Sequence, residues 1–164
     1  MTALSELRRA SASELARMLA GGHRFDPAEL AGRTYAGVSL GLPHAIERLT
    51  WVKFAKAFAR DPATGRLRGH NLRVLQDGLD RPWRPRERNG RPVVFGHFEV
   101  VSHRGGVILD YRRGGSPLRP AALLRDPLVS LSGGSAELLL GRSLIALGGR
   151  QLATPSFFAL LWPG

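Results

Sequence analysis

The sequence predicts a mainly β fold: an antiparallel up-and-down barrel of about eight strands, preceded by a short N-terminal helical lead. From residue 32 onward, apolar and polar residues alternate in short runs, with the two-residue period of strands. Glycine-rich turns of hairpin length separate these runs. No helical segments alternate with them, which argues against a parallel α/β sheet. A meander of about eight strands closes naturally into a barrel, and a two-sheet sandwich is the alternative.

The helical lead is expected over residues 1–31. Ser11 followed by Glu14 has the form of a capping box, in which each side chain bonds the other residue's backbone amide. Asp26 followed by Pro27 has the form of a second helix start. We expect this lead to plug or flank a barrel over residues 32–162. The length of 164 residues predicts one domain, residues 1–164.

Eight runs are expected as strands. Residues 51–60 also fit a helix, but the turn residues at 61–65 and the apolar run after them favour a hairpin. A short helix is expected over residues 44–50. Residues 77–92, with three prolines and five arginines, are expected to form a loop. The expected strands are residues 34–40, 51–60, 67–75, 92–103, 107–112, 128–131, 137–147 and 152–161.

The composition excludes several classes of protein. The chain has no cysteine, so a disulfide scaffold, a thiolate zinc site, an iron–sulfur cluster and a cysteine nucleophile are excluded. No apolar run reaches the length of a membrane-spanning helix, and the charged N-terminal residues do not resemble a secretory signal. A hydrophobic content of 43% with 23% charged residues is typical of a folded domain. We expect a cytoplasmic protein.

The net charge of +11 points toward anionic partners, but the sequence also offers a simpler explanation. Arginine outnumbers lysine by 22 to 2, which is the bias that a GC-rich coding sequence produces. The basic residues are spread along the chain, and only Arg81 to Arg91 forms a dense cluster. No zinc-finger spacing, basic zipper or RNA-recognition motif accompanies that cluster. A nucleic acid is therefore not the expected partner.

Several short motifs resemble a known family. The segment 32–37 reads Gly-Arg-Thr-Tyr-Ala-Gly, a variant of the Gly-x-aromatic-x-Gly opening of lipocalin-like barrels in which Tyr35 stands where Trp is usual. The segment 51–58 begins with Trp and ends Lys-Ala-Phe. Together with segments 109–111, 140–142 and 157–160, these motifs resemble bacterial GxWxG-type lipocalin-like (calycin) proteins. The resemblance implies a barrel with a small-molecule cavity and no catalytic set.

Lys56 is the leading candidate for a ligand anchor. In a strand, Phe54, Lys56 and Phe58 share one face, so a cavity on that face would have a cation beside aromatic walls. Asn71 and Tyr111 are the other candidate polar anchors. The simpler alternative is that Lys56 is a surface charge. The candidate ligand-binding residues are Tyr35, Trp51, Phe54, Lys56, Phe58, Asn71 and Tyr111.

Candidate catalytic residues are His97, Glu99 and Asp110. His97 and Glu99 share a strand face and could supply an acid–base pair, although placing the apolar face inward turns both toward solvent. No metal site is expected, and the chain lacks a nucleophile elbow, a phosphate-binding loop and a dinucleotide fingerprint. No cofactor is expected.

Three functions follow from these patterns. The first is a barrel that binds a small, largely apolar ligand, with an acidic ligand as one option. The second is a small-molecule isomerase, cyclase or hydratase on the same barrel, and the third is anion or nucleic-acid binding through residues 81–91. The sequence does not specify the ligand or the oligomeric state.

Overall fold

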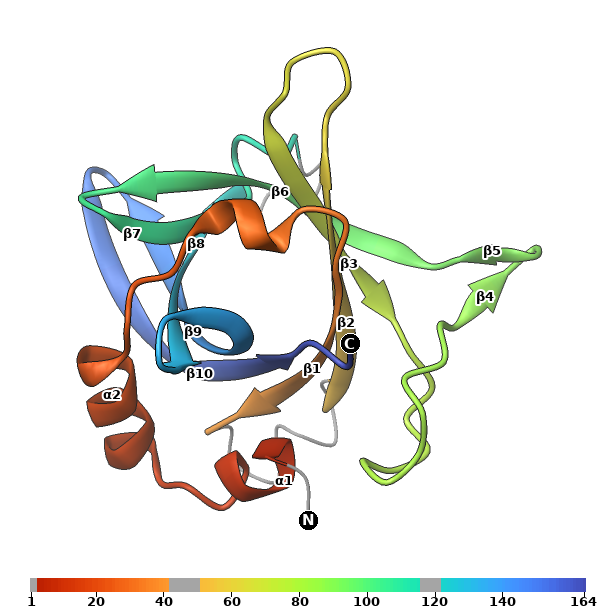
Figure 1. The fold of residues 1–164 in the computed structure, drawn as a ribbon, viewed down its shortest axis with the longest axis horizontal. Helices are drawn as coiled ribbons and strands as arrows, with labels where there is room; N and C mark the ends of the chain where they lie inside the picture. The colour runs from red at the N-terminus through yellow and green to blue at the C-terminus, as the bar shows by residue number, and fades with distance from the viewer. Residues whose placement is uncertain (1–2, 42–50, 116–121) are drawn as a thin grey trace.

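The fold is a closed antiparallel β-barrel with helices against one part of its outer wall (Figure 1). The structure is a computed structural model and describes residues 3–41, 51–115 and 122–164. Going round the barrel, the strand order is β1-β10-β9-β8-β7-β6-β3-β2, and every neighbouring pair is antiparallel. The barrel strands are β1 (Thr34–Leu40), β2 (Lys53–Arg60), β3 (Leu67–Arg73), β6 (Val94–His103), β7 (Gly106–Asp110), β8 (Leu124–Ser132), β9 (Ser135–Leu147) and β10 (Arg150–Leu161).

This architecture confirms the mainly β barrel of about eight strands. The expected strand 128–131 is longer than the sequence indicated, because β8 begins at Leu124. The expected loop 77–92 contains a small hairpin of β4 (Glu87–Arg88) and β5 (Arg91–Pro92), which projects away from the barrel in Figure 1. The short helix expected over 44–50 lies outside the described residues.

The helical lead consists of α1 (Ala3–Leu7), α2 (Ala12–Gly21) and a 3-10 helix, η1 (Pro27–Leu30). The capping box is present: Ser11 Oγ accepts from the Glu14 amide, and the Glu14 carboxylate accepts from the Ser11 amide. Asp26 caps η1 through the Ala28 amide. None of the described helices is long and apolar enough to cross a membrane.

The apolar residues form two cores, one on each side of the barrel wall. On β1, Tyr35 faces the barrel interior, whereas Val38 and Leu40 face outward. The outer core contains Leu4, Leu7 and other residues of α1 and α2 packed on β1, β9 and β10. The helical lead therefore flanks the wall with α1 and α2, and only η1 lies across an end of the barrel (Figure 1).

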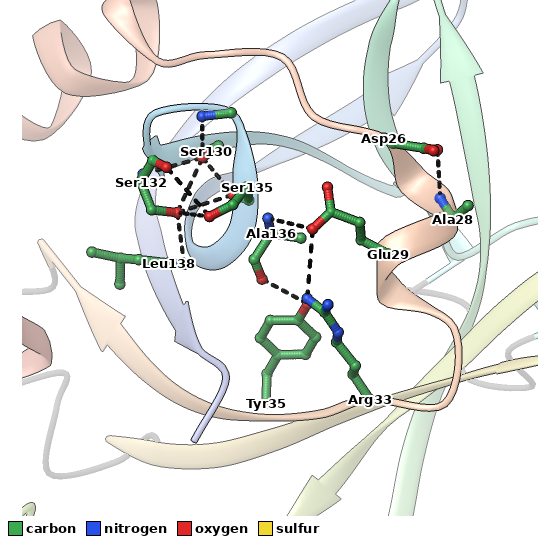
Figure 2. Close-up of polar contacts among 11 residues, drawn as sticks. Asp26, Ala28, Glu29, Arg33, Tyr35, Ser130, Ser132, Ser135, Ala136 and Leu138 are labelled. Atoms are coloured by element: carbon green, nitrogen blue, oxygen red, sulfur yellow. Dashed lines mark hydrogen bonds and ion pairs between the residues drawn. The ribbon is translucent and has the colours of Figure 1, made fainter. Parts of the chain in front are cut away.

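The end of the barrel beside η1 is filled by side chains (Figure 2). Tyr35 donates its hydroxyl proton to the Ala136 carbonyl at 2.8 Å, and Glu29 of η1 accepts from the Ala136 amide at 3.1 Å. Arg33 lies 3.8 Å from the Glu29 carboxylate and stacks on Trp162. We call this the η1 end. Its filled interior restricts any ligand cavity to the opposite half of the barrel.

Candidate functional site

A cavity of about 400 Å³ lies in the barrel half opposite the η1 end. Binding pockets for small molecules are typically about 300–1,000 Å³ and mostly apolar, with a few polar groups. The cavity has that character, since five aromatic side chains and Leu124 share its wall with a few polar groups. Its lining residues are Ser39, Trp51, Phe54, Lys56, Asn71, Phe95, Gly96, Tyr111, Leu124, Asp126, Ser143, Ser156 and Phe158.

Four strands bring the polar groups of the cavity together. Lys56 lies on β2, and its cross-strand partner on β3 is Asn71. Tyr111 directly follows β7, and Asp126 lies on β8. All four side chains point into the barrel because inward positions alternate along each strand. The four residues are 2–5% exposed, so they form a buried polar group.

The polar group is a continuous hydrogen-bonded chain. Lys56 Nζ donates to Asn71 Oδ1 at 2.6 Å and to the Tyr111 hydroxyl at 2.7 Å. The Tyr111 hydroxyl donates to Asp126 Oδ2 at 3.1 Å. The Asn71 amide group donates to the Gly96 carbonyl at 3.2 Å, which turns Oδ1 toward the lysine. Tyr111 therefore stands between the amine and the carboxylate, and Lys56 has no ion-pair contact with a described carboxylate.

Aromatic rings surround the lysine. The Nζ atom lies 5.0–5.5 Å from the ring centroids of Phe54, Phe98, Tyr111 and Phe158. Ring faces attract a cation at such distances, so they offset part of the cost of burying an ammonium group. Three interior glycines face these and neighbouring rings: Gly37 against Phe54, Gly69 against Phe98 and Gly141 against Phe158. A Cβ at any of these glycines would collide with the ring, so glycine leaves the room that each ring occupies.

Burial shifts the protonation equilibria of the group. Loss of hydration lowers the pKa of Lys56 to about 8, against a smaller opposing effect of the Asp126 charge. Loss of hydration also raises the pKa of Asp126 to about 6, while Lys56 and the hydroxyls of Tyr111 and Ser143 act in the opposite direction. The Tyr111 pKa is raised well above its ordinary value, by burial first and by the Asp126 charge second. The amine and the carboxyl group can therefore both exchange protons near neutral pH.

One polar atom of the cavity lacks a partner. Asp126 Oδ1 is buried and makes no hydrogen bond of normal length and angle to any described residue, although the Ser143 hydroxyl lies close enough to act on the carboxylate. Buried polar atoms are nearly always hydrogen-bonded, and an unsatisfied one costs about 1–3 kcal/mol. Because Asp126 lines the cavity, a donor on a bound molecule or an ordered water can complete this carboxylate.

The predicted ligand-binding residues divide into two groups by position. Phe54, Lys56, Asn71, Tyr111 and Trp51 line the cavity, and Trp51 is 39% exposed with its ring 4.9 Å from that of Phe95. The other two predicted residues lie deeper. Tyr35 and Phe58 form an edge-on pair, and Phe58 contacts Phe98 in the same way. They fill the interior beneath the cavity and do not line it.

The predicted catalytic residues lie on the outer wall. His97 is exposed and faces His70, with ring centroids 5.7 Å apart. Glu99 and Asp110 are a cross-strand pair on β6 and β7. Glu99 was expected to face solvent, but it is buried, and both carboxylates are 6% exposed. None of the three residues lines the cavity.

Arginines explain this burial on the outer wall. Arg66 contacts Glu99 at 3.3 Å, and Arg125 contacts Asp110 at 3.0 Å. Arg113 reaches both carboxylates, at 3.7 and 3.6 Å. Carboxylates directly opposite one another on neighbouring strands repel, and these guanidinium groups offset the repulsion.

Two features of the cavity were missed from the sequence. Asp126 is not among the candidates because it precedes the strand expected over 128–131, although Leu124, Asp126, Leu128 and Ser130 already follow the two-residue period. Strict alternation would put Phe95 on the same outward face as His97, but Phe95 lines the cavity. The reason is a bulge in β6, where Gly96 has a φ of +56° and the register with β3 shifts between Gly69 and Asn71.

The second lysine has a structural role on the outer wall. Lys53 Nζ donates to the Asp77 carboxylate at 2.8 Å and to the Gly78 carbonyl at 2.7 Å, and it lies over the Trp83 ring. These contacts hold residues 77–83 against β1 and β2. Within the described parts of the chain, no group of three or more His, Asp or Glu side chains is placed to hold a metal ion.

Comparison with known proteins gives no family assignment. No protein-family model matches the chain, and no curated protein matches it in sequence. The closed eight-stranded antiparallel barrel is compatible with a lipocalin-like fold.

Proposed function

We propose that the barrel binds a small, largely apolar ligand that has one polar head group, and that this head group contacts Lys56, Asn71 and Tyr111. The observation that carries the proposal is the buried Lys56–Tyr111–Asp126 chain in the wall of an otherwise apolar cavity. The apolar wall suits the body of such a ligand, and the chain supplies groups that fix its head. The resemblance to GxWxG-type lipocalin-like barrels points the same way.

The energetic cost of the polar chain supports a function in binding. A buried amine and a buried carboxyl group joined through a hydroxyl are a weak source of stability, and apolar side chains of similar volume would often stabilise a core more. The η1 end shows that this barrel can fill its interior with Tyr35, Phe58 and Leu30. Perturbed ionisable groups in a cavity are more frequent at functional sites than elsewhere.

The donors in the cavity indicate the chemistry of the head group. Lys56 presents an ammonium or amine group, and Asn71 and Tyr111 hold its other contacts in place. An acceptor such as a carboxylate or a carbonyl oxygen therefore matches this end of the cavity best. An acidic ligand also supplies the negative charge that a buried ammonium group requires.

Calorimetric titration with decanoate tests whether the cavity is the binding site. We expect decanoate to bind the natural protein and to lose at least about tenfold in affinity in Ser156→Trp, because the indole ring occupies the cavity. Gln151→Trp is the matched control, since it adds the same ring at an exposed position of the same strand. Equal affinities for the two variants would contradict binding in the cavity.

A second candidate function is acid–base catalysis on the same ligand. It requires an ionisable group in the cavity, and Asp126, with its pKa of about 6, supplies one that His97, Glu99 and Asp110 do not. A substrate for an isomerase, cyclase or hydratase would then be converted by the natural protein and bound unchanged by Asp126→Asn. Binding without turnover in both proteins would favour the binding function alone.

A further inference from the structure

We propose that Lys56 is a nucleophile that captures an apolar aldehyde or ketone in the cavity as a covalent imine. This inference rests on the proposed function and specifies its ligand as a carbonyl compound. Its basis is the set of hydrogen bonds made by Nζ, the position of the Tyr111 hydroxyl, and the unpartnered oxygen of Asp126.

The partners of Nζ match those of a neutral amine. Such an amine has two N–H donors and one lone pair, whereas an ammonium group has three donors and no lone pair. Among the described residues, Nζ donates to two acceptors, Asn71 Oδ1 and the Tyr111 hydroxyl. Both acceptors are uncharged. With its two protons engaged by Asn71 and Tyr111, the amine keeps a lone pair for attack on a carbonyl carbon.

Lys53 provides the contrast within the same strand. Its Nζ contacts the Asp77 carboxylate at 2.8 Å and three backbone carbonyls, of Gly78, Arg81 and Pro82, at 2.7–3.4 Å. A carboxylate together with several carbonyls holds an ammonium ion, and such an ion has no lone pair. The two lysines of the chain therefore occupy opposite environments, one fitted to a cation and one fitted to an amine.

The unprotonated form of Lys56 is also populated near neutral pH. Burial lowers the Lys56 pKa to about 8, so about a tenth of the side chain is unprotonated near pH 7. That fraction is on the order of a hundredfold larger than for an ordinary lysine. Desolvation in an apolar pocket is a recognised way of activating a lysine toward carbonyl groups.

Imine formation balances with the groups that line the cavity. The Nζ lone pair bonds to the carbonyl carbon, and the carbonyl π electrons move to the oxygen, which takes up a proton and gives a carbinolamine. The carbon–oxygen bond then breaks, and the oxygen leaves as water. Nitrogen loses two hydrogens in the two steps, and these account for the two hydrogens of the water. No oxidant or reductant is needed.

Tyr111 and Asp126 are placed to move these protons. The Tyr111 hydroxyl lies 2.7 Å from Nζ and 3.1 Å from Asp126 Oδ2, so it can pass a proton between the nitrogen and the carboxyl group. Asp126 has a pKa of about 6 and so exists in both protonation states near neutral pH. Its free Oδ1 is an acceptor for the hydroxyl of the carbinolamine or for the departing water.

Reductive trapping tests the proposal. The full-length protein is incubated with decanal and sodium cyanoborohydride near neutral pH, and the adduct is located by intact mass and peptide mapping. An imine at Lys56 becomes a secondary amine, with a mass gain equal to that of decanal less one oxygen atom. With only two lysines and the N-terminal amine as candidates, the modified site is assigned without ambiguity.

We expect labelling of Lys56 at least about tenfold faster than labelling of Lys53, because Lys53 Nζ is held by the Asp77 carboxylate and backbone carbonyls outside the cavity. We also expect Tyr111→Phe to slow labelling and to change its pH profile, which loss of packing alone would not do. Ser156→Trp should suppress labelling, whereas the exposed control Gln151→Trp should not. Absence of an adduct at Lys56, or equal labelling at Lys53, would overturn the proposal.

Decanol, titrated in parallel, separates this inference from the proposed function. It has the same chain and no carbonyl group. If decanol binds in the cavity and decanal gives no adduct at Lys56, covalent capture is wrong and ligand binding stands. If neither molecule binds nor reacts, both proposals fail.

Discussion

Lys56 lies at the centre of the barrel chemistry because it is a basic residue in a place that favours its neutral form. It is 3% exposed and surrounded by rings, and the Asp126 carboxylate is reached only through Tyr111. A direct ion pair would hold the amine in its charged form. The Tyr111 hydroxyl between them weakens the influence of the Asp126 charge on Lys56 and still links the two side chains by hydrogen bonds.

The depressed Lys56 pKa predicts a stability that increases with pH. The folded pKa of about 8 lies below the value of about 10.4 for an unfolded lysine, so between these values the unfolded chain binds more protons. The free energy of unfolding should therefore rise by about 2 kcal/mol from about pH 7 to about pH 10.

Urea unfolding at the two pH values measures this rise, with Lys56→Met as the reference. Methionine keeps the apolar stem and removes the titration, while the other ionisable groups remain in both proteins. The rise should be absent in Lys56→Met. The same pH dependence in both proteins would show that Lys56 is hydrated in the folded state.

At the residue scale, the positions of the cavity lysine and of Phe54 were easier to predict from the sequence than those of the carboxylates. Phe54 and Lys56 share a face in any strand over 53–60, so their inward position followed from the two-residue period. Glu99, a candidate base, lies on the outer wall, and Asp126, which the sequence did not single out, lines the cavity. Which carboxylate faces inward depends on strand ends and bulges, and local patterns did not reveal these.

At the element scale, the bulge in β6 shapes the cavity. A regular strand would place Phe95 and Phe98 on opposite faces, but the extra residue at the bulge turns both inward. Gly96 has a φ of +56°, and its carbonyl fixes the Asn71 amide. The alternation across 92–103 suggested an unbroken strand, because a single glycine is only a weak signal of a bulge.

Gly96→Ala should therefore destabilise the protein through two effects. A Cβ at a positive φ costs about 1–2 kcal/mol, and at this position it would also crowd the Asn71 amide nitrogen. Gly65 is the matched control, since it has a φ of +67° and open space around the added Cβ.

We expect Gly96→Ala to lower the free energy of unfolding by about 1 kcal/mol more than Gly65→Ala, because an Asn71 hydrogen bond is lost as well. Urea unfolding of both variants gives the difference. Equal losses would mean that Asn71 adjusts without cost and that the bulge does not position it.

At the scale of the whole molecule, the barrel is asymmetric along its axis. The η1 end is filled by Tyr35, Phe58 and the contacts of Glu29, and the opposite half contains the cavity. The short helical lead and the barrel were predictable because caps and alternation are local signals. The division into a filled end and a hollow end was not, because it depends on which rings meet across the barrel.

The net charge of +11 is a property of the whole molecule. The β4–β5 hairpin projects from the barrel and carries exposed arginines, but other arginines are ion-paired on the wall. We expect only weak, sequence-independent DNA binding, with a dissociation constant of about 10⁻⁴–10⁻⁶ M at physiological salt.

Fluorescence anisotropy with two unrelated DNA duplexes checks this expectation. Affinity for both duplexes should fall steeply with salt, and replacing Arg84, Arg86, Arg88 and Arg91 with glutamine should reduce the salt dependence. Tight binding to one duplex alone at physiological salt would instead support nucleic acid as the partner.

We propose that the cavity binds an apolar ligand through Lys56. Calorimetric titration of the natural protein and Lys56→Met, each with decanoate and decanol, tests it most directly. We predict that Lys56→Met weakens decanoate binding by about 1.5–3 kcal/mol, the usual contribution of a hydrogen bond to a charged group, and leaves decanol binding nearly unchanged. Equal decanoate affinities in the two proteins would contradict Lys56 as the anchor.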